Sequence, residues 1–342
     1  MADKGIAATE VGGLLMVGLP GGALDDSTRE LIARQRVNDF ILFSRNVESP
    51  EQLTRLCAEL AAACQAAGLP PPLIAIDQEG GTVNRLPEPF TRFPDARQLA
   101  GGPDPEAALT AYARTCATEL QAVGININFA PVLDLCPMDQ GFYMERRVLG
   151  DDPATVARLG RLLIETMQTH GLAACGKHFP GLGAARLDPH QDLPTLERSW
   201  EELSTYDLPP FEAAVAVPVA LIMTSHTVYP ALDRERPATL SAPILTDLLR
   251  RQMGYDGVIV TDDLEMGAID HNLPMEEAVT AALTAGADQL LICHDHDKAR
   301  RALKHLRRQL HAGELAPAPV AAALRRIAAL RRRYAQSRPK EG

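Results

Sequence analysis

The feature that most constrains this chain is a repeat of short apolar runs separated by longer amphipathic stretches. The apolar runs lie at residues 14–18, 40–43, 73–76, 125–129, 173–176, 220–224, 258–260 and 289–292. They are nearly continuous in aliphatic residues, so both faces of each strand are expected to be buried. Strands that alternate with helical segments predict a parallel sheet covered by helices.

Three of the intervening segments carry clear helix boundaries. Ser49 precedes Pro50 at the start of one helix and Gly68 closes it, which is the usual arrangement of a capping side chain, an N-terminal proline and a left-handed exit. Gln52 stands three residues after Ser49, so we expect it to complete a capping box. Two further helices are predicted from Asp104-Pro105 to Gly124 and from Asp152-Pro153 to Gly171.

Polar residues follow the strands directly, and this favours a closed barrel over an open doubly wound sheet. The series reads Ser44-Arg45-Asn46, Asp77-Gln78-Glu79, Asp134, Lys177-His178, Ser225-His226, Asp262-Asp263 and His294-Asp295. In a barrel all of these residues meet at one rim, whereas in an open sheet they spread along an edge. We therefore expect an α/β fold, a single (β/α)8 TIM-type barrel with its core at about 11–312 and a helical extension over 313–342.

The longest stretches without clear secondary structure are residues 78–103, 136–151 and 179–206. Long irregular loops are uncommon in a compact domain unless they have a function, so these segments are candidates for lining the site. No linker or short-period repeat indicates a second domain.

Bulk composition excludes several kinds of partner. The formal net charge of −10 argues against nucleic acid as the main partner, because phosphate binding needs a positive surface. The first apolar run, residues 11–19, is too short to cross a bilayer, and no basic leader precedes it. The six cysteines are scattered, as in a reduced protein. We therefore expect a cytoplasmic protein without a membrane or nucleic-acid partner, its oligomeric state left open.

Several residues at the predicted rim have side chains that could take part in catalysis or binding. Asp262 ends a buried strand, where a carboxylate could be a nucleophile, a metal ligand or a helix cap. Lys177 and His178 also end a strand and could donate hydrogen bonds to sugar hydroxyls. Asp188 and His190 lie two residues apart in a loop, so the carboxylate could orient an imidazole that exchanges a proton near neutral pH; a purely structural pairing is the alternative.

A metal site is the main competing interpretation of the same rim. His178, His190, His226 and His294 could share it with the strand-end carboxylates, as in metal-dependent hydrolase barrels. The chain has no His-x-His pair after its first strand and no tight ligand spacing. We expect neither a metal nor another cofactor.

Taken together, these segments resemble the NagZ-type β-N-acetylglucosaminidases of glycoside hydrolase family three. The resemblance runs from Gly12 to His294. Its most specific parts, in order along the chain, are Ile-Asp-Gln-Glu-Gly-Gly at 76–81, Asn-Phe-Ala-Pro-Val-Leu-Asp at 128–134, Lys-His-Phe-Pro-Gly at 177–181 and Asp-Gly-Val-Ile-Val-Thr-Asp-Asp at 256–263.

The resemblance implies a retaining hydrolase that removes terminal β-linked N-acetylglucosamine from peptidoglycan fragments in the cytoplasm. It implies that Asp262 is the nucleophile and that His190, paired with Asp188, is the acid/base. The residues implied to bind the sugar ring are Asp77, Arg85, Arg146, Lys177 and His178. Arg146 is followed by Arg147, so the register of this match has two solutions.

Two positions depart from the family pattern. Leu182 stands between Gly181 and Gly183 where close relatives have histidine, and Pro189 replaces a common serine and stiffens the loop between Asp188 and His190. Two other functions fit the same residues. A histidine acid/base carries no fixed negative charge, so a phosphorylase is one alternative, and a non-catalytic sugar-binding barrel is the other.

Overall fold

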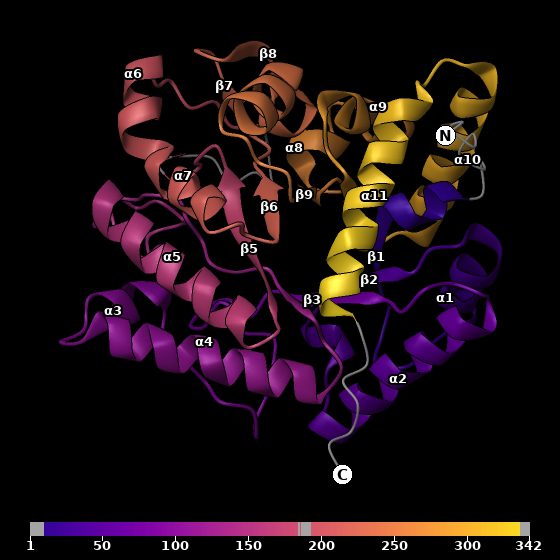
Figure 1. The fold of residues 1–342 in the computed structure, drawn as a ribbon, viewed down its shortest axis with the longest axis horizontal. Coiled ribbons are helices and arrows are strands. Elements are labelled where there is room, and N and C mark those ends of the chain that lie inside the picture. Colours follow the sequence, from indigo (N-terminus) through magenta and orange to yellow (C-terminus); the bar gives the residue numbers. More distant parts are fainter. Residues whose placement is uncertain (1–9, 184, 186–192, 336–342) are drawn as a thin grey trace.

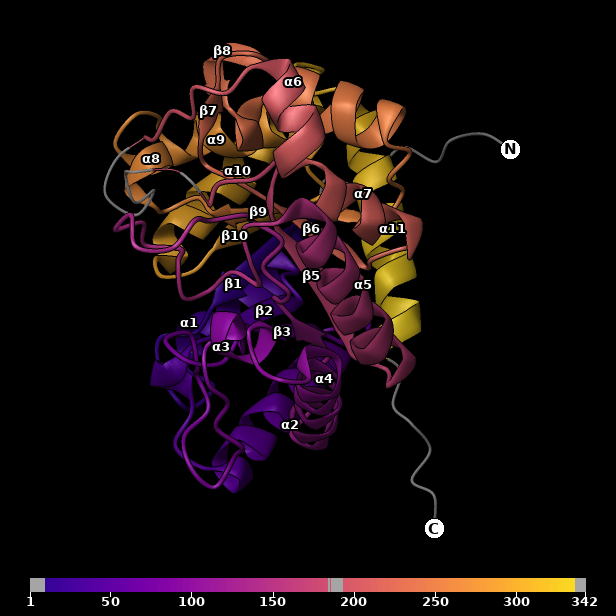
Figure 2. The same ribbon diagram turned by 90° about the vertical axis from the view of Figure 1, so that its left-hand side faces the viewer.

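The computed structural model describes residues 10–183, 185 and 193–335, and Figures 1 and 2 show it from two sides. Its strands close into a parallel barrel in the spatial order β1-β10-β9-β6-β5-β4-β3-β2. These barrel strands are β1 (Leu15–Gly18), β2 (Asp39–Leu42), β3 (Leu73–Ile76), β4 (Ile127–Asn128), β5 (Ala173–Phe179), β6 (Leu221–Thr224), β9 (Val258–Asp263) and β10 (Gln289–Ile292).

Each of these strands falls on one of the predicted apolar runs, and the predicted barrel is confirmed. Closure is made by the first and last strands, since β1 pairs with β10 from Leu15↔Leu290 to Val17↔Ile292. β5 and β9 extend further than predicted and include Lys177, His178, Asp262 and Asp263. These polar residues therefore belong to rigid strand ends.

Helices surround the barrel (Figures 1 and 2). They are α1 (Asp26–Glu30), α2 (Pro50–Ala66), α3 (Ala96–Ala100), α4 (Pro105–Ala122), α5 (Pro153–Thr169), α6 (Trp200–Glu202), α7 (Pro209–Ala216), α8 (Gly267–Asp270), α9 (Met275–Ala285), α10 (His296–Ala312) and α11 (Pro317–Tyr334). π-helical segments at Leu31–Gln35, Leu203–Asp207 and Pro243–Gln252, and a small hairpin of β7 (Val228–Tyr229) and β8 (Asp233–Pro237), were not predicted.

The helix caps form as predicted, with one exception. The Ser49 side chain accepts a hydrogen bond from the Gln52 backbone at 3.2 Å. The Gln52 side chain does not return this bond to Ser49, so the predicted capping box is wrong. Its Oε1 instead accepts from the Glu48 backbone at 2.9 Å, and its Nε2 donates to the Asn46 carbonyl at 3.1 Å. The amide is nearly buried and ties the helix start to the preceding loop.

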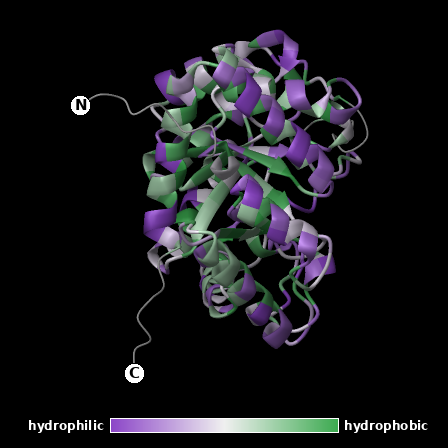
Figure 3. Ribbon diagram, turned by 90° about the vertical axis from the view of Figure 1, so that its right-hand side faces the viewer, coloured by the Kyte–Doolittle hydropathy of each residue, from purple (hydrophilic) through white to green (hydrophobic). Residues whose placement is uncertain are grey.

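Hydrophobic residues gather on the strands and on the inner helix faces, while hydrophilic residues lie outward (Figure 3). All six cysteines are buried free thiols. No helix within residues 10–183, 185 and 193–335 combines the length and apolar character needed to cross a bilayer.

α11 is bound to the barrel by a buried ion pair. Asp39, the first residue of β2, is fully buried, and Arg331 Nη2 lies 2.7 Å from its Oδ1. Gln289 at the start of β10 donates to Asp39 Oδ2 at 2.8 Å. These residues begin their strands, so α11 covers the end of the barrel opposite to the polar rim.

Candidate active site

Polar side chains gather at the carboxyl ends of β3, β5, β9 and β10, around a cavity of about 220 Å³. The polar residues that line it are Asp77, Arg85, Arg147, Lys177, His178, Asp262, Asp263 and His294. Apolar side chains, among them Phe43 and Phe129, complete the wall. Five residues predicted to form the site therefore meet in one place: Asp77, Arg85, Lys177, His178 and Asp262.

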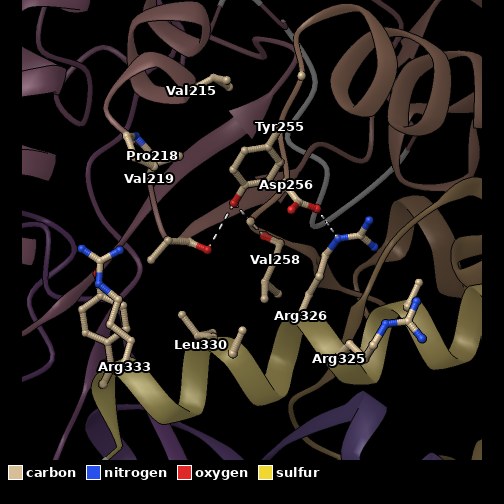
Figure 4. A pocket seen from close by; sticks show the side chains of 16 residues that line it. Val215, Pro218, Val219, Tyr255, Asp256, Val258, Arg325, Arg326, Leu330 and Arg333 are labelled. Carbon is tan, nitrogen blue, oxygen red and sulfur yellow. Dashed lines mark hydrogen bonds and ion pairs between the residues drawn. The ribbon is translucent and has the colours of Figure 1, made fainter. Parts of the chain in front are cut away.

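A larger cavity, of about 620 Å³, lies beside α11 near the start of β9 (Figure 4). Its polar groups are largely engaged in structural contacts. Tyr255 donates to the Val258 carbonyl at 3.1 Å, and Arg326 pairs with Asp256 at 3.1 Å. Active sites of this fold are built at the carboxyl ends of the strands, so we place the candidate site in the smaller cavity.

Lys177 is the centre of a buried charge network. Its Nζ lies 2.7 Å from both Asp77 Oδ1 and Glu79 Oε1. Arg147 forms a two-pronged contact with Glu79, with Nε and Nη2 at 2.9 and 2.8 Å from the two oxygens. Burial opposes ionisation, but Arg147 and Lys177 hold the pKa of Glu79 far below its usual value. The network keeps the ammonium of Lys177 charged and in one position.

The structure places the two neighbouring arginines differently. Arg146 Nε lies 2.7 Å from Asp95 Oδ2, and its side chain is 65% exposed and does not line the cavity. Arg147 does line it, held by Glu79. Because Arg147 and not the predicted Arg146 lines the cavity, we propose Arg147 as the arginine of the candidate site. Glu79, which positions both cations, was not among the predicted site residues, although it stands in the same motif as Asp77.

The orientation of His178 is set by a buried carboxylate. Asp134 Oδ2 lies 2.7 Å from His178 Nδ1, and Asp134 Oδ1 accepts from the Leu182 backbone at 2.8 Å. This contact fixes the imidazole ring at the cavity wall. The sequence placed Asp134 after a strand and at the end of the 128–134 motif, but it was not among the predicted site residues. Leu182 is buried and contributes its backbone to this arrangement.

Asp262 and Asp263 end β9 and both line the cavity. The Asp263 backbone N–H donates to Asp262 Oδ1 at 2.8 Å. Burial, together with the nearby carboxylates of Glu265 and Asp262, raises the pKa of Asp263 to about 7.

Asp188 and His190 lie outside the described residues, so their predicted pairing remains a prediction. His226 is not among the residues lining the cavity, and its ring nitrogens contact the fold itself, with Nδ1 2.7 Å from Thr239 Oγ1 and Nε2 2.9 Å from the Asp263 carbonyl. In the part of the chain that the structure describes, no three His, Cys, Asp or Glu side chains converge as metal ligands do.

A parallel barrel whose rim presents strand-end carboxylates in a small polar cavity is one of the arrangements that glycosidases use. The family model described as the glycosyl hydrolase family 3 N-terminal domain matches residues 7–330. The chain belongs to glycoside hydrolase family 3. The expected family and the expectation of a glycosidase are confirmed.

Relatives in sequence cover most of the chain. It is 38% identical over 296 residues to a protein of Pseudomonas aeruginosa named beta-hexosaminidase, covering 86% of this chain and 87% of that protein. A protein of the same name from Thioalkalivibrio sulfidiphilus is 40% identical over 299 residues, covering 86% and 84%.

Solved structures of family 3 enzymes are similar to this chain in fold and in sequence. A family 3 beta-N-acetylglucosaminidase from Paenibacillus matches with a TM-score of 0.91 and 36% identity over 98% of this chain. The match spans 65% of the Paenibacillus chain, a little under two thirds of its length. The beta-N-acetylhexosaminidase of Beutenbergia cavernae matches with a TM-score of 0.88 and 30% identity, covering 96% of this chain and 99% of that one.

Proposed function

We propose that this chain is a retaining β-N-acetylhexosaminidase that releases terminal β-linked N-acetylglucosamine. The observation that carries the proposal is the position of Asp262, at the end of β9 in a cavity of about 220 Å³ whose walls hold fixed hydrogen-bond donors and acceptors. A cavity of this size suits one sugar ring, which favours removal of terminal residues. The names of the sequence relatives and structural neighbours support the same activity.

In the proposed mechanism, Asp262 attacks the anomeric carbon and the leaving group departs as the glycosyl–enzyme ester forms. His190 gives its proton to the departing oxygen, and Asp188 stabilises the imidazolium that supplies it. In the second step neutral His190 takes a proton from water, and the water oxygen attacks the anomeric carbon. The carbon–oxygen bond to Asp262 breaks, and the carboxylate and the protonated histidine are restored.

We assign sugar binding to the charge network beside the nucleophile. Lys177 presents donors held in place by Asp77 and Glu79, and Arg147 is fixed by its paired contacts with Glu79. Because these groups are already ordered, binding a sugar ring costs little additional side-chain entropy. Asp77, Arg85 and His178 complete the polar wall.

The natural substrate we propose is a muropeptide fragment of peptidoglycan, hydrolysed in the cytoplasm during cell-wall recycling. The motifs around Asp77, Asp134, Lys177 and Asp262 support it, because together they resemble the enzymes that act on such fragments. Hydrolysis of N-acetylglucosaminyl-anhydromuramyl peptides, followed by chromatography of the released sugar, tests this substrate directly.

The Asp262→Asn variant tests the proposed activity. We expect kcat for 4-nitrophenyl N-acetyl-β-glucosaminide to fall by roughly three orders of magnitude or more, because the covalent step loses its nucleophile. Asp247→Asn, an exposed acid paired with Arg251, is the matched control and should keep full activity. If Asp262→Asn retains most of its activity, the nucleophile assignment is wrong.

The same assay with added inorganic phosphate separates hydrolysis from phosphorolysis. We expect free N-acetylglucosamine as the product at every phosphate concentration. Accumulation of N-acetylglucosamine 1-phosphate would identify the phosphorylase alternative, and sugar binding without turnover would identify a non-catalytic barrel.

A further inference from the structure

One wall residue of the active-site cavity differs from the others in its exposure. The side chain of His294 is 57% exposed, whereas every other described residue lining this cavity is buried or half-buried. At the opposite extreme, Lys177 and His178 are only 2% and 5% exposed in their side chains. His294 therefore lies at the mouth of the cavity, and the other two lie at its closed end.

The mouth is where the rest of a substrate must lie. If one terminal sugar fills the cavity, its glycosidic oxygen and everything beyond that oxygen extend outward. The inference that the leaving group lies at the mouth rests on the proposed function, because it assumes that the terminal sugar binds in the cavity. Groups at the mouth then contact the leaving group, which the nucleophile never touches.

His294 also lines a second cavity, and it is the residue that the two linings share. This groove has a volume of about 420 Å³ and lies between the loop after β1 and the start of α10. Its other lining residues are Pro20, Asp25, Ser27, Asp295, His296, Asp297 and Arg300. His294 is thus common to the linings of the active-site cavity and of an open polar groove.

Several contacts hold His294 in this position. Its ring stacks on Phe43 with centroids 5.7 Å apart and an interplanar angle of 26°. Its Nε2 lies 3.5 Å from Asp263 Oδ2, and its backbone N–H donates to Glu265 at 2.6 Å. Because these contacts already order the exposed side chain, a ligand that binds to it loses little free energy to side-chain ordering.

The groove beyond His294 is rich in hydrogen-bond acceptors. Asp25 Oδ1 caps α1 by accepting from Thr28, and Asp295 Oδ1 caps α10 by accepting from the backbone of Asp297 and Lys298. These contacts fix both carboxylates at the groove wall. Sugar hydroxyls and amide N–H groups are the donors that match such a surface.

We infer that His294 and this groove bind the leaving-group side of the substrate, and that they select leaving groups containing at least one further sugar ring. His294 is a positioning residue that contacts the first ring beyond the scissile bond. The groove receives the part of the leaving group beyond that ring, which is a second ring in a chitooligosaccharide and the peptide in a muropeptide. The pair formed by Phe43 and His294 then determines which glycosides are hydrolysed efficiently.

The test compares substrates that differ only beyond the scissile bond. N-acetyl-β-glucosaminyl fluoride has a leaving group of one atom, which cannot reach His294. N,N′-diacetylchitobiose and N,N′,N″-triacetylchitotriose place one and two sugar rings there. For His294→Ala we expect kcat/KM to fall about tenfold or more on both oligosaccharides, mainly through KM, and to stay within about twofold on the fluoride.

A second variant tests the groove without altering the cavity. Asp297 has a side chain that is 77% exposed, so Asp297→Trp should fold and partly fill the groove. We expect it to lower kcat/KM for the chitotriose about fivefold or more and to leave the fluoride unchanged. Lys304→Trp, seven residues further along α10 on the same helix face and outside the groove lining, is the matched control and should behave as the parent protein.

The outcomes separate this inference from the proposed function. Equal losses on the fluoride and the oligosaccharides, or no loss for His294→Ala, overturn the role of His294. Equal effects of Asp297→Trp and Lys304→Trp overturn the role of the groove. If the unaltered chain releases no N-acetylglucosamine from any of these substrates, the proposed function itself fails.

Discussion

At the scale of single residues, the buried charges around Lys177 form the most extensive ion-pair network of the candidate site. The network joins two carboxylates and two cations by direct contacts: Asp77 and Glu79 with Lys177, and Glu79 with Arg147. Removing one member leaves its partners buried and unpaired, and this costs far more than the loss of a surface ion pair.

This difference gives a prediction for the two neighbouring arginines. Arg147→Ala should lower kcat/KM for an aryl N-acetylglucosaminide by about 10- to 100-fold, because Glu79 is left with Lys177 alone and draws it away from Asp77. Arg146→Ala should change kcat/KM by no more than about threefold, since that side chain is 65% exposed and outside the cavity. Steady-state kinetics measures kcat/KM of the two variants, and comparable losses would contradict the proposal that Arg147 is the arginine of the site.

A second residue-scale prediction concerns stability and pH. Asp207 is buried beside Gly181, with Arg198 Nε 3.0 Å from its Oδ2. Burial raises the pKa of Asp207 to about 7, although Arg198 opposes the shift. The folded state therefore holds an extra proton between about pH 4 and pH 7. The contribution of this proton to the free energy of unfolding is fully present below about pH 4. It is lost progressively as the pH rises to about 7.

Asparagine imitates the protonated acid, so Asp207→Asn should remove this slope. We expect the difference in the free energy of unfolding, variant minus parent, to increase by about 2 kcal/mol from pH 5 to pH 8. Urea unfolding across this range measures the gain. Asp247→Asn, at an exposed position, controls for the change of net charge. If the difference in the free energy of unfolding between variant and parent does not change with pH, Asp207 is ionised over the whole range.

At the scale of elements, α11 is part of the barrel structure and not a loose extension. Arg331 pairs with the fully buried Asp39, and Arg326 lies 3.1 Å from Asp288 at the end of the loop before β10. Burial raises the pKa of Asp39 even though Arg331 lowers it. The sequence pattern predicted a helix here but gave no sign of this attachment, because both partners are ordinary charged residues some 290 positions apart.

The attachment predicts a large effect from one substitution. Arg331→Met should lower the free energy of unfolding by about 3–5 kcal/mol, because it leaves the Asp39 carboxylate buried without a cation. Arg332→Met, at the next and exposed position, should change it by no more than about 0.5 kcal/mol. Urea denaturation followed by circular dichroism gives both values, and similar values would mean that the buried pair contributes nothing particular.

At the scale of the whole molecule, barrel closure brings together residues from Asp77 to His294. We propose that the described chain is a single domain, because α11 packs on the amino-terminal segment Glu10–Leu14 and on β9. The urea transition of the unaltered chain should accordingly be single and should coincide with loss of activity. This arrangement also explains why the candidate site spans motifs that are far apart in sequence.

Local patterns in the sequence determined the strands, most helix boundaries and the family. These features depend on the spacing of apolar residues and on capping side chains within a few positions, which a chain carries in any context. Only the tertiary structure decided that Arg147 and not Arg146 lines the cavity, that Glu79 contacts both cations, and that His294 lines both the cavity and a groove. Side-chain direction in loops, charge partners and burial depend on neighbours distant along the chain, so no local pattern encodes them.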